Sequence, residues 1–190
     1  MKKTVVTFGL ISGAVSAATM LATIPFTDAI GWEKGEILGY TMIVLSALIV
    51  FFGVRSYREN VGGGRLTFGR GFAVGILITL ISSACYVATW EVIYYKLMPG
   101  FAGKYATHMV ERAKASGASQ QQIEKKEREA QQFKQMYDNP AINVALTFTE
   151  VFPIGLVVAL ISAGILRKTG RDPENEASKH GSADFQKSDA

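Results

Sequence analysis

Cysteine and charge are both scarce in this chain of 190 residues. The single cysteine, Cys85, excludes an intramolecular disulfide and a cysteine-based metal site. Only 19% of the residues are charged, and they are nearly missing from four apolar blocks and crowded between them. A block of roughly 18 to 25 apolar residues lets an α-helix cross about 30 Å of hydrocarbon. Four such blocks in a soluble domain would leave almost no amphipathic surface to cover them, so the sequence predicts an all-α integral membrane protein.

The four apolar blocks are predicted to form a four-helix transmembrane bundle. Small residues recur four positions apart in several of them, which lets helices approach closely in a membrane. The first block would also fit a cleaved signal peptide, because it follows Lys2 and Lys3 and contains small residues. We expect a retained helix, since no polar region interrupts the apolar run. The predicted spans are 4–25, 37–54, 71–95 and 141–166, and the predicted helix-packing residues are Gly9, Gly13, Gly71, Gly75, Gly155 and Ala159.

Basic residues beside the spans predict the orientation of the bundle. If every block spans, the basic residues at the N-terminus, within 55–70 and within 167–171 fall on one side. The opposite loop, 26–36, carries three acidic residues against one lysine. Both termini should therefore be cytoplasmic, and topology explains the net charge of +4 without nucleic acid. The transmembrane domain covers 1–168, and the polar stretch 169–190 is predicted to be a disordered cytoplasmic tail.

The long segment between the third and fourth spans predicts an extracytoplasmic, amphipathic helical hairpin over about 100–138. Apolar residues from Phe101 onward recur at helical spacing. Ser119, followed three residues later by Gln122, is typical of a capping box and predicts the start of the second helix. We expect this hairpin to lie against the outer ends of the spans. Docking of an extracytoplasmic partner is the alternative.

Three local sequences resemble one known family of bacterial membrane proteins. They are GRLTFGRGFAVG before the third span, YVATWEVIYYKLMPGF at its outer end, and YDNPAINVALTFTEVFPIGLVVALISAGILRK around the fourth span. The chain resembles the DUF4199 family of small four-helix membrane proteins over most of residues 3–168. The resemblance implies the four-span topology and a bacterial origin. It implies no activity and no site, because the family is functionally uncharacterised.

Two glutamates fall inside predicted spans, where a charge needs a partner, a proton or a function. Glu91 and Glu150 lie at depths of roughly 10 and 15 Å from the same surface, at 1.5 Å per residue. If their carboxyls meet, repulsion and desolvation would make them share a proton, as in a proton relay or a cation site. The alternatives are bonds to nearby polar side chains, an ion pair with Lys96 or Lys104, or contact with a ligand or lipid. Pro153, three residues after Glu150, predicts a kink beside it.

The sequence favours a non-enzymatic membrane protein with a structural, assembly or regulatory role. The alternative is a small proton- or cation-coupled transporter or channel subunit that uses Glu91 and Glu150. An enzyme has no positive support, and a Ser/His/Asp arrangement is excluded because His108 and His180 would lie on opposite sides of the membrane. No cofactor or metal is predicted. The expected partner is the lipid bilayer, and the small-residue pairs are compatible with a homo-oligomer or a membrane-complex partner.

Overall fold

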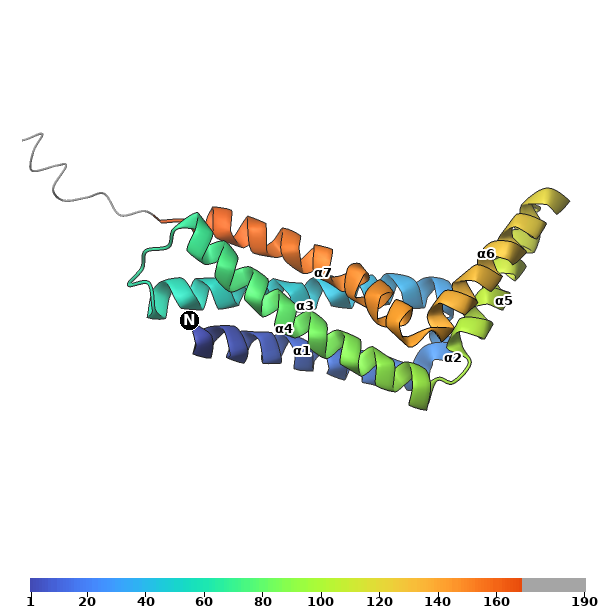
Figure 1. The fold of residues 1–190 in the computed structure, drawn as a ribbon, viewed down its shortest axis with the longest axis horizontal. Coiled ribbons are helices and arrows are strands. Elements are labelled where there is room, and N and C mark those ends of the chain that lie inside the picture. The colour runs from blue at the N-terminus through green and yellow to red at the C-terminus, as the bar shows by residue number, and fades with distance from the viewer. Residues whose placement is uncertain (169–190) are drawn as a thin grey trace, which may run out of the picture.

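The computed structural model describes residues 1–168, and each regular element within this range is a helix. Four long helices lie side by side, and two further helices project from one end of them (Figure 1). The predicted tail, 169–190, lies outside the described residues. The elements are α1 (Lys2–Thr23), a 3₁₀ turn (Ile24–Phe26), α2 (Thr27–Ile30), α3 (Trp32–Asn60), α4 (Phe68–Val92), a π-helical turn (Ile93–Leu97), α5 (Phe101–Ala115), α6 (Gln120–Asp138) and α7 (Pro140–Ile165).

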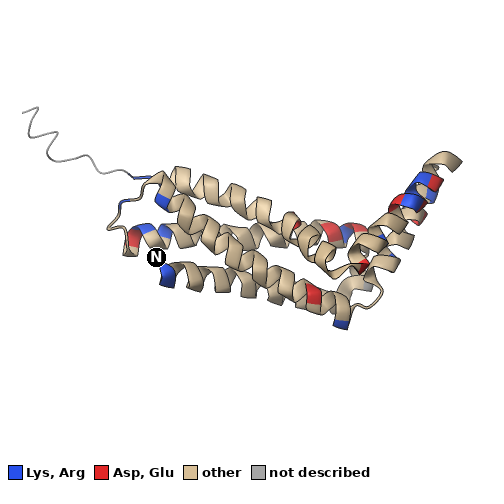
Figure 2. Ribbon diagram, in the orientation of Figure 1, with Lys and Arg blue, Asp and Glu red and all other residues tan. Residues whose placement is uncertain are grey.

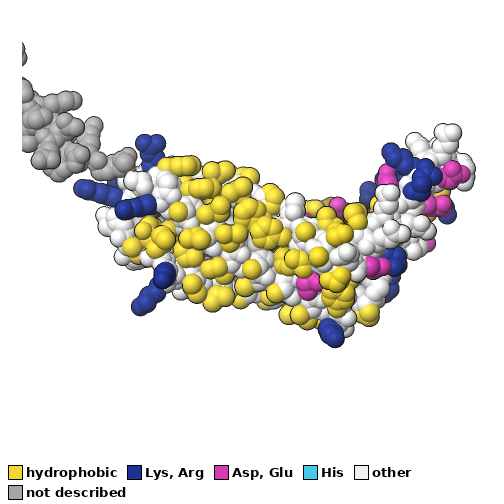
Figure 3. All heavy atoms as spheres, viewed as in Figure 1, with side chains coloured by type: hydrophobic (Ala, Val, Ile, Leu, Met, Phe, Trp, Pro, Cys, Tyr) yellow, Lys and Arg dark blue, Asp and Glu magenta, His cyan; other side chains and the backbone are white. Residues whose placement is uncertain are grey.

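Four helical segments of the described chain are long and apolar enough to cross a membrane, as the sequence predicts. Hydrophobic side chains cover the visible face of the bundle, whereas charged side chains gather near its ends (Figure 3). Large apolar side chains such as Ile37 and Ile165 are exposed by 69% and 68%. Such a surface suits lipid better than water, so the fold indicates a multi-pass membrane protein. The segments are Lys2–Phe26, Trp32–Asn60, Phe68–Leu97 and Pro140–Ile165.

The bundle has two ends of different character (Figure 2). We call the end that holds the N-terminus the basic end, and the end from which α5 and α6 project the distal end. Acidic and basic side chains are mixed on α5 and α6 at the distal end (Figure 2). The basic end carries Lys2, Lys3, Arg55, Arg58, Arg65, Arg70, Arg167 and Lys168.

The second spanning helix begins earlier than the sequence predicts. The span was expected to start at residue 37 after a loop over 26–36, but α2 occupies part of that loop and α3 begins at Trp32. Gly31, with φ +72°, separates the two helices. The Trp32 ring packs against Phe101, with ring centroids 5.6 Å apart, which holds the first turn of α3 against α5. Hydropathy misses this turn because three of the four residues after Trp32 are charged.

Small residues bring α4 into close contact with α7 and α1. A Cβ atom on Gly75 would lie 2.8 Å from the Ala159 Cβ and 3.2 Å from its Cα. Carbon atoms in normal contact are about 3.5–4.0 Å apart, so the approach of α4 to α7 depends on glycine. The other contacts of this kind join Gly71 to Ala163, Gly155 to Thr79, Gly9 to Ile81 and Gly13 to Cys85.

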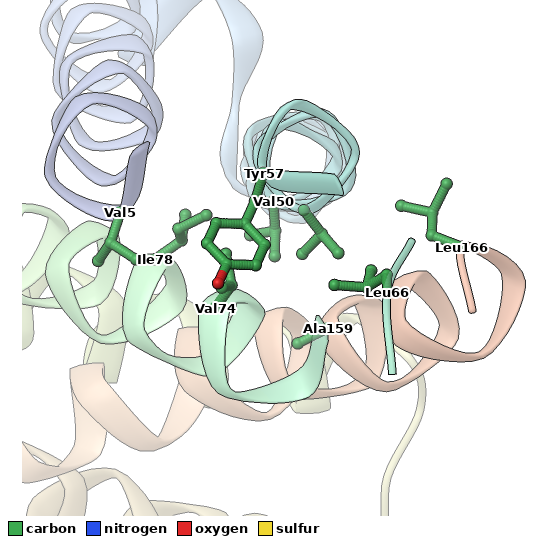
Figure 4. Packing of buried hydrophobic residues seen from close by; sticks show 9 residues of the cluster. Val5, Val50, Tyr57, Leu66, Val74, Ile78, Ala159 and Leu166 are labelled. Atoms are coloured by element: carbon green, nitrogen blue, oxygen red, sulfur yellow. The ribbon is translucent and has the colours of Figure 1, made fainter. Parts of the chain in front are cut away.

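A dry apolar core fills the basic end of the bundle. Val54, Val74 and Ile78 have no exposed surface. Side chains from α1, α3, α4 and α7 point toward one another there (Figure 4). Leu66 pairs with Lys168 in a short antiparallel bridge that joins the α3–α4 loop to the end of α7. The basic end is therefore closely packed, and the larger open space of the bundle lies elsewhere.

α5 and α6 pack against each other and join the bundle through aromatic contacts. Ser119 and Gln122 form both hydrogen bonds of a capping box at the start of α6. Tyr105 of α5 packs on Phe133 of α6, with centroids 5.1 Å apart. An ion pair between Arg112 Nε and Glu33 Oε1, 3.5 Å apart, adds a contact between α5 and α3.

Candidate functional site

A cavity of about 660 Å³ lies at the distal end. All seven α-helices of the described chain contribute to its wall, so it lies where the bundle meets α5 and α6. Its size falls within the range of about 300–1,000 Å³ that is usual for small-molecule sites. Residues of α5 and α6 that line the cavity include Phe101, Tyr105, Phe133 and Tyr137, all of them aromatic.

Aromatic side chains form much of the cavity wall: two tryptophans, four tyrosines and two phenylalanines. The Trp90 and Phe101 rings meet edge to face at 5.1 Å, and the Trp32 and Tyr105 rings do so at 5.4 Å. The chain contains two tryptophans in all, and both line this cavity. The aromatic residues are Trp32, Tyr40, Tyr86, Trp90, Phe101, Tyr105, Phe133 and Tyr137.

Among the side chains that the structure describes, Glu150 and Glu36 are the charged ones of the cavity wall. Glu150 lies about three turns into α7, is exposed and lines the cavity. The Tyr40 phenol lies close enough to the Glu150 carboxyl to interact with it, and Glu36 contributes to the electrostatic surroundings of that carboxyl. Glu36 and Tyr40 stand one turn apart on α3. Within residues 1–168, no lysine, arginine or histidine lines the wall.

The two acidic residues also influence tyrosines on α5 and α6. Burial, and after it the Glu150 carboxylate, raises the pKa of Tyr137 to about 12. Burial, followed by the Glu36 carboxylate, raises the pKa of Tyr105. A negative charge disfavours ionisation of a nearby phenol, so these shifts have the direction expected for hydroxyls that face carboxylates.

Asn143, which is fully buried, holds one side of the cavity together. Its Oδ1 accepts hydrogen bonds from Trp90 Nε1 and from Thr147 Oγ1, both at 3.2 Å. Its Nδ2 donates to the Tyr137 carbonyl oxygen at 3.2 Å. This one side chain therefore connects α4, α6 and α7 and fixes the position of the Trp90 ring.

A second, smaller void of about 20 Å³ lies toward the middle of the bundle and shares Ser16 and Ile43 with the cavity wall. Its lining includes Ser46, Thr79 and Ser83, which are exposed by 4%, 3% and 1%. Their hydroxyl oxygens have no hydrogen-bond partner among the described residues. The void is large enough for one water molecule, so the cavity adjoins a small polar compartment.

The residues singled out from the sequence occupy different surroundings. Glu150 lines the cavity, whereas Glu91 is not among the lining residues, and its Oε1 is buried without a hydrogen-bond partner in the described chain. Trp90 and Thr147, two polar side chains near the glutamates in the sequence, donate hydrogen bonds to Asn143. The structure therefore does not bring Glu91 and Glu150 together on one cavity wall.

Pro153 lies inside α7, which continues through it, and its side chain is exposed rather than part of the cavity. The small residues Gly155 and Ala159 on the same helix face α4. Glu150 thus lines the cavity, whereas the small residues contact α4.

Sequence reasoning missed Glu36, Tyr40 and Asn143 as parts of the site. Glu36 was assigned to a loop for its charge, although Trp32, Glu36 and Tyr40 recur at the four-residue spacing of one helix face. Asn143 carried a weaker signal, because it is a polar residue at the edge of an apolar block. The four-residue spacing of Trp32, Glu36 and Tyr40 could have placed them on one helix face, but it could not identify the helix that this face contacts.

Four apolar helices that enclose a ligand-sized cavity at one end define a small multi-pass membrane protein of the helical-bundle class. The chain belongs to the DUF4199 family, whose description is "protein of unknown function" and whose model matches residues 7–168. The match confirms the family resemblance found in the sequence motifs. No curated protein and no solved structure matches the chain.

Proposed function

We propose that this protein binds a small molecule in the distal cavity and acts as a binding protein rather than an enzyme. The observation that carries the proposal is the cavity itself, about 660 Å³ in volume and lined by apolar and aromatic side chains with a few polar groups. This combination is the usual character of a ligand site. The chemistry supports binding over catalysis, because within residues 1–168 no histidine, cysteine or lysine lines the cavity to act with the carboxyls.

The proposal includes an orientation. Because cytoplasmic flanks of spanning helices are enriched in lysine and arginine, the basic end would face the cytoplasm of a bacterium. The distal cavity, together with the α5–α6 hairpin, would then lie on the outer side of the inner membrane, and the N-terminus would be cytoplasmic. A structural or regulatory role, including homo-oligomer formation or docking of a membrane partner, is compatible with ligand binding.

Transport that depends on a shared Glu91–Glu150 site has less support, because only Glu150 lines the cavity. A flux assay in vesicles with Glu91→Gln and Glu150→Gln addresses that alternative directly. Equal loss of proton or cation flux in both variants would favour a shared site over the proposed binding function.

The test uses both tryptophans, because Trp32 and Trp90 line the cavity and no other tryptophan is present in the chain. The full-length protein in detergent micelles is titrated with the uncharged dye N-phenyl-1-naphthylamine, which accepts energy from excited tryptophan. We expect a saturable transfer signal on top of the linear signal from dye in the micelle.

Two glycine variants make the test specific. A Cβ atom at Gly39, which lines the cavity, would meet no atom within 4 Å, so Gly39→Phe should fill the cavity without disturbing its wall. Gly164→Phe is the matched control, because Gly164 also has open space but lies near the basic end of α7. We expect Gly39→Phe to remove the saturable signal and Gly164→Phe to keep it. A saturable signal unchanged in Gly39→Phe would contradict the proposal.

The orientation has its own test. In a Cys85→Ser background, Gln121→Cys places a thiol on α6 and Asn60→Cys places one at the basic end, and both positions are exposed. A membrane-impermeant maleimide should label Gln121→Cys in intact cells and Asn60→Cys after permeabilisation. The reverse result would invert the topology.

A further inference from the structure

We infer that the ligand of the distal cavity carries an ammonium group on an apolar body. This inference rests on the proposed function and names the class of ligand. It starts from the charge of the wall: Glu36 and Glu150 are acidic, and no basic side chain from residues 1–168 accompanies them. A buried anion would meet two carboxylates, whereas a cation would pair with them, so the charge selects one sign.

The aromatic wall favours an organic cation over a metal ion. Eight rings surround the space, and the faces of tryptophan and tyrosine attract ammonium groups by cation–π interaction. A bare divalent ion would need about six oxygen ligands close together. Among the described residues, no group of three histidine, cysteine or acidic residues is placed to hold a metal ion. A substituted ammonium needs only one carboxylate and surrounding rings, which is what this wall provides.

The adjoining void adds an observation that does not depend on charge. Three hydroxyl groups at Ser46, Thr79 and Ser83 are at least nine-tenths buried and lack partners within the described chain. They line the void that shares Ser16 and Ile43 with the cavity. A buried hydroxyl without a partner is costly, so these groups are suited to a ligand polar atom or a ligand-bound water.

A free amine and the headgroup of an aminolipid present the same ammonium chemistry to Glu150. The cavity lies where the spanning helices meet α5 and α6. The experiment therefore contains one arm for each source.

The test measures displacement of N-phenyl-1-naphthylamine by phenyltrimethylammonium and by its uncharged isostere, tert-butylbenzene. The two compounds have nearly the same shape and differ in charge. We expect the cation to displace the dye from wild type and Glu150→Gln to weaken this displacement roughly ten-fold, since charge-assisted and cation–π contacts are lost or weakened together. The isostere should be affected little by the substitution.

Glu91→Gln is the matched control, because Glu91 is an acidic residue of a spanning helix that does not line the cavity. Its affinity for the cation should equal that of wild type. Glu150→Asp keeps the charge and should retain most of the binding. If Glu150→Gln does not fold, Glu36→Gln tests the same wall, with a smaller expected loss of a few-fold.

The two sources are separated in nanodiscs. Addition of phosphatidylethanolamine to phosphatidylglycerol nanodiscs weakens the apparent affinity for phenyltrimethylammonium if a lipid headgroup occupies the site, and leaves it unchanged if the ligand is a free amine. This comparison separates the two sources once Glu150→Gln has weakened displacement by the cation.

Equal displacement by the cation and the isostere, with no effect of Glu150→Gln, would overturn the ammonium assignment. In that case the saturable dye signal and its loss in Gly39→Phe would still support a binding cavity. Absence of the saturable dye signal in wild type would instead overturn the proposed function, so the two failures are distinguishable.

Discussion

The contact between α4 and α7 provides the most direct test of the fold through Gly75→Ala. The new Cβ atom would lie 2.8 Å from the Ala159 Cβ and 3.2 Å from its Cα. The first distance is about 1 Å shorter than a normal carbon contact. Ala159 is completely buried and its Cα belongs to the helix backbone, so the overlap can be relieved only if the helices separate. Overpacking of this kind costs about 1–3 kcal/mol.

The matched control for this prediction is Gly39→Ala. It lies in the interior of α3, where a Cβ atom meets nothing within 4 Å, so it reports the gain in helix propensity of about 1 kcal/mol without a clash. Unfolding free energies measured by SDS titration in mixed micelles should place Gly75→Ala about 1–3 kcal/mol below wild type after this correction.

A compensating substitution sharpens the prediction. Ala159→Gly removes the methyl group that Gly75→Ala would strike, so the double variant transfers one methyl from α7 to α4. We expect it to recover most of the lost stability relative to the sum of the single variants. Additive effects, or a Gly75→Ala variant as stable as Gly39→Ala, would refute the packing argument.

Three further substitutions test the site. Asn143→Ala should lower the unfolding free energy by about 1–3 kcal/mol, because it leaves Trp90 Nε1 without its hydrogen-bond acceptor. The control Asn60→Ala, at an exposed site, should change the unfolding free energy little. Equal effects of the two substitutions would count against the Asn143 hydrogen-bond network. Tyr137 is neutral in the folded protein and ionised in the unfolded chain between about pH 10 and its folded pKa of about 12, so stability should fall over this interval and fall less in Tyr137→Phe. An identical pH dependence of the SDS midpoint in both proteins would contradict the Tyr137 shift. Thr79→Val removes a hydroxyl to which a water molecule in the small void would bond. The substitution should lower the unfolding free energy by about 1 kcal/mol. A higher unfolding free energy in the same SDS titration would mean that the hydroxyl has no partner.

Long apolar blocks made the spans predictable from sequence, because hydropathy over about 20 residues determines whether a helix suits a membrane. The capping box at Ser119 was equally readable, since it depends on residues three positions apart. The start of α3 was not, because Trp32 is held by rings of α5 that lie about 70 residues later in the chain. Local patterns predicted local structure, whereas the packing of rings across the bundle depended on tertiary contacts.

The position of Glu150 along its helix follows from the sequence, but its neighbours on other helices do not. A rise of 1.5 Å per residue gives depth along a helix, whereas the neighbours depend on the rotation of each helix about its axis. The same limit applies to Glu91, which shares the distal half of the bundle but not the cavity wall. Glu36 and Tyr40 could be assigned to one face of α3, yet their meeting with Glu150 required the relative rotation of α3 and α7.

The location of the cavity follows from the sizes of side chains along the bundle. Gly75 meets Ala159 and Gly71 meets Ala163, so α4 and α7 are closely packed toward the basic end. At the distal end, rings of α5 and α6 line the space between the spanning helices. The helices therefore leave open space where the carboxyl of Glu150 lies. The residues that pack the bundle closely at one end thus leave room at the other for a charged side chain, which lines a cavity and interacts with the Tyr40 phenol.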